Sequence, residues 1–121
     1  MRIKELICNM RIRPKMYVQE VRMDYIFHFL IGYRVANAKL PEDNMDRRFC
    51  SWFGKWLLLW IENNIDSKYQ PTSAAWYDDI IRITPEGQNE VDLFFDLCDK
   101  FFEDYENKTG YFSWRDENKK A

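Results

Sequence analysis

The sequence predicts a single all-α domain of about five helices packed around one central helix. The 121 residues include only four Gly and four Pro, too few for the frequent turns of a β-sandwich or barrel. Apolar residues recur at intervals of three and four along most of the chain, which is the spacing of amphipathic helices. Residues 49–61, FCSWFGKWLLLWI, are so nearly apolar all round that other helices must cover them on several sides.

The predicted central helix covers residues 45–65. Its main stripe places large apolar side chains at positions i, i+3, i+4, i+7, i+8 and i+11, namely Phe49, Trp52, Phe53, Trp56, Leu57 and Trp60. Little is left to face solvent beyond Ser51, Gly54, Lys55 and Glu62. Crossing a bilayer takes about 20 apolar residues, so this interrupted run is predicted to be the core of a globular domain.

Two helices are predicted before the central one. The first ends near Arg13, because Pro14 disfavours helix in the residue before it. Residues 13–20 then form a loop in which Met16 and Tyr17 are expected to plug the core. The second helix covers residues 22–38, with Gly32 placed to permit a close helix crossing. Its inward positions are Ile26, Phe29, Leu30 and Tyr33.

Two more helices are predicted after the central one. The fourth covers residues 73–83, and its inward positions are Trp76, Tyr77, Ile80 and Ile81. The fifth is expected to begin at Thr84, with Pro85 in its first turn, and to end near Asn107, before Gly110. An apolar clasp is expected to follow, formed by Tyr111, Phe112 and Trp114. The domain is therefore assigned to residues 1–114, with residues 115–121 as a disordered tail.

The cysteines and the single histidine give no sign of catalysis. Cys8, Cys50 and Cys98 lie in apolar runs without a CxxC motif, and His28 has no partner in the sequence. We therefore expect no metal site and no cofactor, and no catalytic residues emerge. Three buried free thiols, with no signal peptide at the N-terminus, suit the cytoplasm.

Charge is distributed unevenly along the chain. Residues 1–61 carry a net charge of +5 and residues 62–106 a net charge of −9. In the fifth helix, acids at steps of four and three residues should align on one outward face, with only Lys100 to relieve their repulsion. These are Asp92, Asp96, Asp99, Glu103 and Glu106, with Asp78 and Asp79 of the preceding helix expected to adjoin them. The face is either a solvated surface or a site that docks on a basic partner.

The loop after the first helix, Arg11-Ile12-Arg13-Pro14-Lys15-Met16-Tyr17, resembles the RxRPxMY segment near the start of the ATPase domain of DNA gyrase B-type enzymes. The acidic helix and the DxGxG nucleotide loop of that family do not follow here. The segment is therefore interpreted as a joint between two helices.

A wider pattern spans roughly residues 5–105. It consists of the RPxMY loop, a Phe-Leu-x-Gly-Tyr helix end (Phe29–Tyr33), the Trp/Phe-rich helix, a Ser…Trp-Tyr-Asp turn (Ser73–Asp78) and a Phe-Phe-x-Leu helix (Phe94–Leu97). This order resembles small bacterial immunity proteins encoded beside polymorphic or contact-dependent growth-inhibition toxins. The resemblance implies a cytoplasmic protein that binds and neutralises one cognate toxin domain, without catalysis.

The expected partner is accordingly a toxin domain with a basic surface, such as a nuclease. No nucleic acid or membrane is expected to bind, and the chain is expected to be a monomer or a small homo-oligomer. The alternative is a nucleic-acid-binding module that uses the basic first third of the chain. Its contact residues would be Arg2, Lys4, Arg11, Arg13, Lys15 and Arg22.

Overall fold

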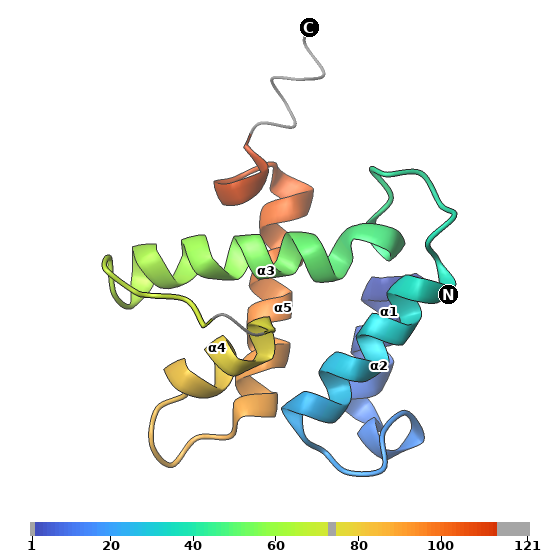
Figure 1. The fold of residues 1–121 in the computed structure, drawn as a ribbon, viewed down its shortest axis with the longest axis horizontal. Helices are drawn as coiled ribbons and strands as arrows, with labels where there is room; N and C mark the ends of the chain where they lie inside the picture. Colours follow the sequence, from blue (N-terminus) through green and yellow to red (C-terminus); the bar gives the residue numbers. More distant parts are fainter. Residues whose placement is uncertain (1, 73–74, 114–121) are drawn as a thin grey trace, which may run out of the picture.

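The computed structural model describes residues 2–72 and 75–113, and this part of the chain contains helices and no strands (Figure 1). The predicted all-α class is therefore confirmed. The elements are α1 (Ile3–Ile12), η1 (Pro14–Met16), α2 (Met23–Ala36), α3 (Met45–Asn64), α4 (Trp76–Ile83), α5 (Glu90–Asn107) and η2 (Gly110–Phe112), where η denotes a short 3₁₀ helix. The predictions for Ser73, Trp114 and residues 115–121 fall outside the described residues.

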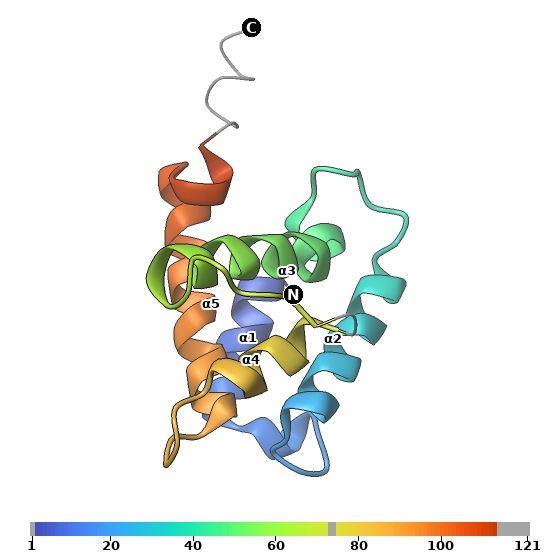
Figure 2. The same cartoon turned by 60° about the vertical axis from the view of Figure 1, so that its left-hand side comes forward.

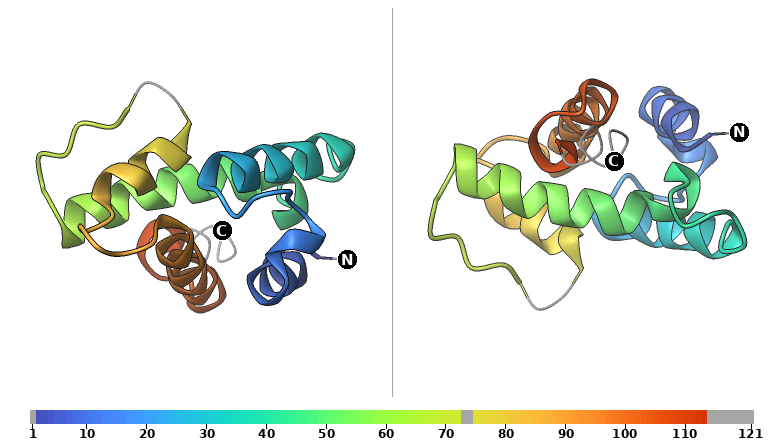
Figure 3. Two further views of the ribbon diagram at one scale, coloured as in Figure 1. Left: turned by 90° about the horizontal axis from the view of Figure 1, so that it is seen from below. Right: turned by 90° about the horizontal axis from the view of Figure 1, so that it is seen from above.

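The central helix α3 lies between two pairs of helices. Seen along the vertical direction of Figure 1, α1 and α5 lie on one side of α3, and α2 and α4 lie on the other (Figure 3). In the turned view of Figure 2, α5 and α2 lie on opposite sides of the molecule and α3 runs across near the top. A helix enclosed in this way must be apolar on several faces, which is what the composition of residues 49–61 predicts.

Phe53 stands at the centre of the core. Its ring is fully buried and meets three other rings at steep angles, with centroid distances of 4.8 Å to Trp76, 5.6 Å to Phe94 and 5.5 Å to Phe101. Such edge-to-face pairs stabilise by about 0.5–1.5 kcal/mol each beyond the burial of area. One residue of α3 thus joins α4 and α5 to the core.

Gly54, next in the chain, is the glycine at which two helices approach closely. A Cβ atom there would lie 3.1 Å from Trp76 Cδ1, so a side chain at this position would require the Trp76 ring to shift by a few tenths of an ångström. From the sequence, Gly32 was expected to permit the close helix crossing, and Gly54 was expected to face solvent. A Cβ at Gly32 would meet nothing within 4 Å, so that prediction is wrong, because a helical pattern shows an element's own faces and not where its neighbours cross.

The start of α5 differs from the prediction. Thr84 ends α4 instead of capping α5, and its Oγ1 donates a hydrogen bond to the Ile80 carbonyl at 2.6 Å. A turn follows, with Gly87 at a φ of 85° that suits glycine. Asn89 is the true N-cap, since its Oδ1 accepts from the backbone N–H groups of Val91 and Asp92. The predicted end of the helix at Asn107 is confirmed.

The loop between α1 and α2 packs differently from the expected plug. Met16 is 70% exposed, while Tyr17 is partly buried against Phe29, with a ring distance of 5.6 Å. Val18, only 7% exposed, is the residue of this loop that enters the core. The 3₁₀ turn over Pro14–Met16 directs the Met16 side chain outward.

The predicted burial of side chains in α4 and in the segment after α5 is confirmed in part. In α4, Trp76 and Ile80 are buried as predicted, but Ile81 is 42% exposed. In η2, Phe112 is fully buried and meets the Trp52 and Phe101 rings at 5.9 and 5.3 Å. The predicted clasp is therefore confirmed for Phe112.

We expect Trp56→Ala to lower the free energy of unfolding by about 3–5 kcal/mol, the usual effect of leaving a cavity in place of a buried Trp. Trp56 is 2% exposed, and its Nε1–H donates to Asp104 Oδ2 at 2.8 Å, so the substitution also removes a tertiary hydrogen bond. Urea denaturation followed by circular dichroism measures the loss. Trp60→Ala, at a partly buried site on the same helix, is the control and should lose much less. Equal losses in the two variants would contradict the central position of Trp56.

Candidate interaction surface

Five carboxylates form an exposed row on α5, which we call the acidic ridge. Its members are Asp92, Asp96, Asp99, Glu103 and Glu106, and all five are exposed. The opposite side of α5 is buried, with Phe94, Phe101 and Leu97 inaccessible to solvent. The apolar stripe packs against the rest of the core, so the acids at the intervening positions must face outward. The predicted ridge is therefore present as a surface feature.

The ridge is not as isolated as the sequence suggests. Arg11 of α1 donates from Nη2 to Asp96 Oδ1 at 2.6 Å and from Nη1 to Asp99 Oδ2 at 2.8 Å. Lys4, also on α1, forms an ion pair with Glu106. The expectation that only Lys100 relieves the repulsion is therefore wrong. Contacts between residues so distant in the chain leave no signal in either segment's periodicity.

These ion pairs are exposed and correspondingly weak. The side chains of Arg11, Asp96 and Asp99 are 42%, 60% and 70% accessible. The hydrogen bond to Asp99 is the main influence that raises the pKa of the Arg11 guanidinium; partial burial opposes it, and Asp96 adds to it. Exposed pairs typically contribute about 0.2–1 kcal/mol. They can therefore be exchanged for other partners at small cost.

Asp79 does not belong to this surface, although the sequence analysis grouped it there. It is 3% exposed and accepts hydrogen bonds from Tyr69 OH at 2.6 Å, from Thr72 N at 3.0 Å and from Thr72 Oγ1 at 3.3 Å. It thus fastens the segment before α4 to that helix. Asp78 is partly buried in the first turn of α4, and no hydrogen bond or ion pair joins it to the acidic ridge within the described residues.

A second carboxylate that the sequence analysis did not single out holds three helices together. Asp46, in the first turn of α3, accepts from the Ile3 backbone N–H at 2.5 Å and from Tyr33 OH at 3.0 Å. The start of α1 and the end of α2 are thereby fixed to α3. The only sequence signal is its place two residues after Asn44, the N-cap of α3.

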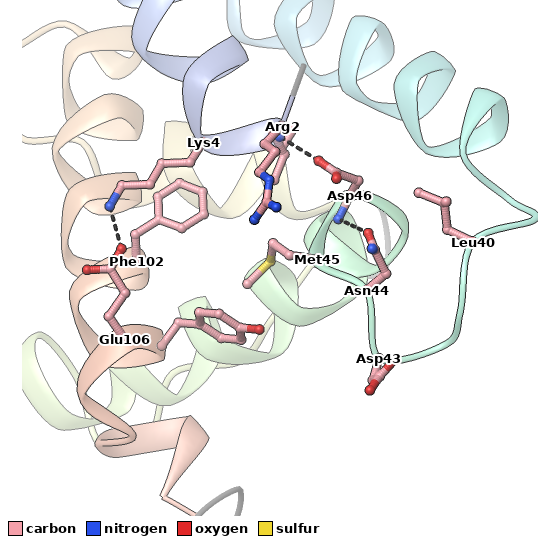
Figure 4. Close-up of a pocket in the computed structure, with 11 residues that line it drawn as sticks. Arg2, Lys4, Leu40, Asp43, Asn44, Met45, Asp46, Phe102 and Glu106 are labelled. Atoms are coloured by element: carbon pink, nitrogen blue, oxygen red, sulfur yellow. Dashed lines mark hydrogen bonds and ion pairs between the residues drawn. The ribbon is translucent and has the colours of Figure 1, made fainter.

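Asp46 also lines a pocket of about 530 Å³ at the end of the acidic ridge (Figure 4). The pocket lies between the beginnings of α1 and α3 and the last turns of α5. Lys4 reaches across one side to Glu106, and Arg2 extends into the middle (Figure 4). Two basic residues, Arg2 and Lys4, and three acidic ones, Asp43, Asp46 and Glu106, line the pocket, so its charges largely offset one another.

The basic residues of the alternative hypothesis are dispersed in the structure. Lys4 and Arg11 pair with the acidic ridge, and Arg22 pairs with Asp24 at 2.9 Å. Arg2, Arg13 and Lys15 are exposed. Half of the proposed nucleic-acid contacts are therefore already bound to carboxylates of the same chain.

In the described ranges 2–72 and 75–113, no cluster of three or more His, Cys, Asp or Glu residues has the geometry to hold a metal ion. His28 is exposed and donates from Nδ1 to the Asp24 carbonyl at 2.7 Å. Within the same ranges, no helix combines the length and the hydropathy needed to cross a membrane.

The three cysteines are free thiols with different surroundings. Cys50 and Cys98 are buried as predicted, but Cys8 is exposed, so the expectation of three buried thiols is wrong for Cys8. Cys8 lies on the rim of a groove of about 230 Å³ between α1 and α5. Its apolar sequence neighbours occupy the buried face of α1, which leaves position 8 on the other face.

Comparisons with protein-family models, with curated proteins and with solved structures find no match for this chain.

We expect a thiol reagent to label Cys8 rapidly in the native protein and to reach Cys50 and Cys98 only after denaturation. Burial raises the pKa of the Cys50 thiol to about 11 and that of Cys98 well above its ordinary value, so both lack thiolate as well as access. Mass spectrometry of samples quenched over time measures the order. Rapid labelling that persists in Cys8→Ser would contradict the assignment.

We also expect stability to fall between pH 10 and 12 as Tyr33 and Tyr69 ionise. Burial, followed by the hydrogen bonds to Asp46 and Asp79, raises the pKa of each phenol to about 12. The unfolded value is about 10. The stabilisation is therefore complete below the unfolded value and disappears as pH rises through the folded one.

The measurement is urea denaturation from neutral pH upward, and Tyr33→Phe with Tyr69→Phe should flatten the decline. Tyr25→Phe, at an exposed ring that contacts Arg22 and no carboxylate, is the control and should leave the decline unchanged. The assignment of the alkaline loss of stability to these two phenols is wrong if the free energy of unfolding falls with pH equally in the double variant and in the wild type.

Proposed function

We propose that this chain is an immunity-type inhibitor that binds one cognate toxin domain and neutralises it by covering its active cleft. The observation that carries the proposal is the acidic ridge, whose five carboxylates are exposed along a single helix. The order of sequence motifs shared with small immunity proteins supports the same class. In this proposal the chain performs no catalysis and acts in the cytoplasm.

The ridge suits a basic cleft such as the substrate groove of a nuclease. Successive acids are about one helical turn apart, roughly 5.4 Å along the axis, so they present a regular row of negative charge. A groove that binds the phosphates of a nucleic acid would find a comparable row here. Charge of this kind raises the association rate by steering the approach of the partner.

The ion pairs with α1 prepare the ridge for this role. Asp92 and Glu103 have no cation partner in the described part of the chain, and their carboxylates are available at once. Asp96 and Asp99 are held in place by Arg11, and they remain 60% and 70% accessible. A partner's arginine can join or replace Arg11, because an exposed pair stabilises the free protein only slightly.

Asp92→Lys combined with Glu103→Lys is expected to slow association with the cognate toxin by about tenfold or more at low salt, because electrostatic steering accounts for factors of that size. Raising the salt concentration should lower the association rate of the wild type steeply and reduce the difference in rate between the wild type and the variant. The reason is that charges are screened beyond about 8 Å at physiological ionic strength. Stopped-flow or surface-based kinetics with the toxin domain encoded beside this chain's gene measures both effects.

Glu42→Lys with Glu62→Lys is the matched control, because both residues are exposed acids outside α5 and its flanking turns and the net charge changes equally. Arg11→Ala should have the opposite effect and speed association, since it removes positive charge from the ridge. Equal rates for the ridge variant and the control would place the interface elsewhere. No binding by the wild type would count against the proposed function itself.

A further inference from the structure

A basic pocket lies on the other side of α3 from the acidic ridge. The last turns of α2 and the first turns of α3 enclose about 440 Å³ there, near the loop that joins these two helices in Figure 1. The residues that line it are Arg34, Val35, Ala38, Arg47, Arg48 and Ser51. Three arginines thus border one pocket without a carboxylate among its lining residues.

Among the described residues, these three arginines have no acidic partner, a property they share with most cations of the chain. Arg11 and Arg22 each form ion pairs with acids of the chain. No ion pair joins Arg34, Arg47 or Arg48 to any described residue. Guanidinium groups stay charged at every physiological pH, so their mutual repulsion in the pocket is not relieved by loss of a proton.

Much of the hydrogen-bonding capacity of these arginines is unused. Arg47 donates from Nη1 to the Leu40 carbonyl at 2.8 Å, which leaves most of its five N–H donors free. Arg48 lies over the Trp52 ring at 5.8 Å, and its Nε is buried with no hydrogen-bond partner in the described chain. Buried donors are nearly always paired in folded proteins, so an unpaired Nε on Arg48 is unusual.

Arg34 completes the group from the neighbouring helix. Burial raises the pKa of the Cys50 thiol to about 11, and the charge of Arg34 opposes that shift. The Arg34 side chain starts on α2 and lines the pocket together with residues of α3. Positive charge reaches the pocket from both helices.

We propose that this pocket binds the phosphate group of a small phosphorylated molecule. Arg34, Arg47 and Arg48 supply charged donors from two helices, and the Ser51 hydroxyl supplies another. A phosphate presents oxygens in several directions and can accept from several guanidinium groups, whereas the two oxygens of a carboxylate are matched by one. The volume falls in the ordinary range for small-ligand pockets, about 300–1,000 Å³, which leaves room for an organic part beside Val35 and Ala38.

The test is isothermal titration calorimetry with inorganic phosphate and with glycerol 3-phosphate, at constant ionic strength set by chloride. Wild type should bind at least one of these probes saturably. Arg34→Gln should weaken binding by about tenfold or more, the effect of losing a charge-assisted hydrogen bond. Arg48→Lys keeps the charge but loses the planar fork, and it should weaken binding as well. Tighter binding of glycerol 3-phosphate identifies a monoester as the ligand, and equal binding identifies the free ion.

Lys15→Gln is the matched control, because it removes one exposed positive charge remote from the pocket and should bind like the wild type. The proposal fails if the wild type gives no saturable binding, or if Lys15→Gln weakens binding as much as Arg34→Gln does. Binding of a single-stranded oligonucleotide without any response to the two small probes would overturn it in favour of a nucleic-acid surface. Circular dichroism checks that each variant is folded. Because the Arg34 side chain is exposed, Arg34→Gln should fold normally, and the test therefore remains valid even if Arg48→Lys does not fold.

Discussion

The packing of the Phe53 ring against three other aromatic rings is the interaction on which the rest of the structure depends. This ring meets Trp76 from α4 and both Phe94 and Phe101 from α5, so three helices must be in place together before it is covered. Gly54 suits this arrangement, because a Cβ atom at position 54 would lie 3.1 Å from Trp76 Cδ1 and crowd its ring. Losing any one of these rings would leave a cavity rather than allow a simple shift, since packed interiors relax only in part.

The same packing decides which charges face one another. Once Phe94 and Phe101 are turned toward Phe53, the acids of α5 have no other direction than outward. Asp46 fixes the start of α1 through the Ile3 N–H, and Arg11 at the other end of this helix pairs with Asp96 and Asp99. The electrostatic character of the surface is therefore a consequence of how the core closes.

Helical periodicity was enough to predict the number of helices, the central position of residues 45–65 and the outward direction of the acidic ridge. It was not enough for features that depend on a neighbouring element. Thr84 looks like an N-cap from its own segment, yet its hydroxyl is used by the end of α4. Asp79 looks like a surface acid, yet Tyr69 and Thr72 reach it from the preceding segment. In both cases the hydrogen-bond partner that determines the role of the side chain lies outside the helical segment whose periodicity was used for the prediction.

The two charged surfaces differ in how the chain itself balances them. The acidic ridge receives cations from α1, so its net field is moderated, and among the described residues Asp92 and Glu103 are the ridge carboxylates without an ion pair. The arginine pocket receives no such balance, although the chain has 20 acids for 18 Lys and Arg and two of those acids, Glu42 and Asp43, lie in the loop between α2 and α3. An acid at an exposed lining position such as Val35 or Ala38 would pair with the arginines but stabilise the fold only slightly. A phosphate bound as proposed stabilises the folded state by mass action and needs no acid of the chain in that place.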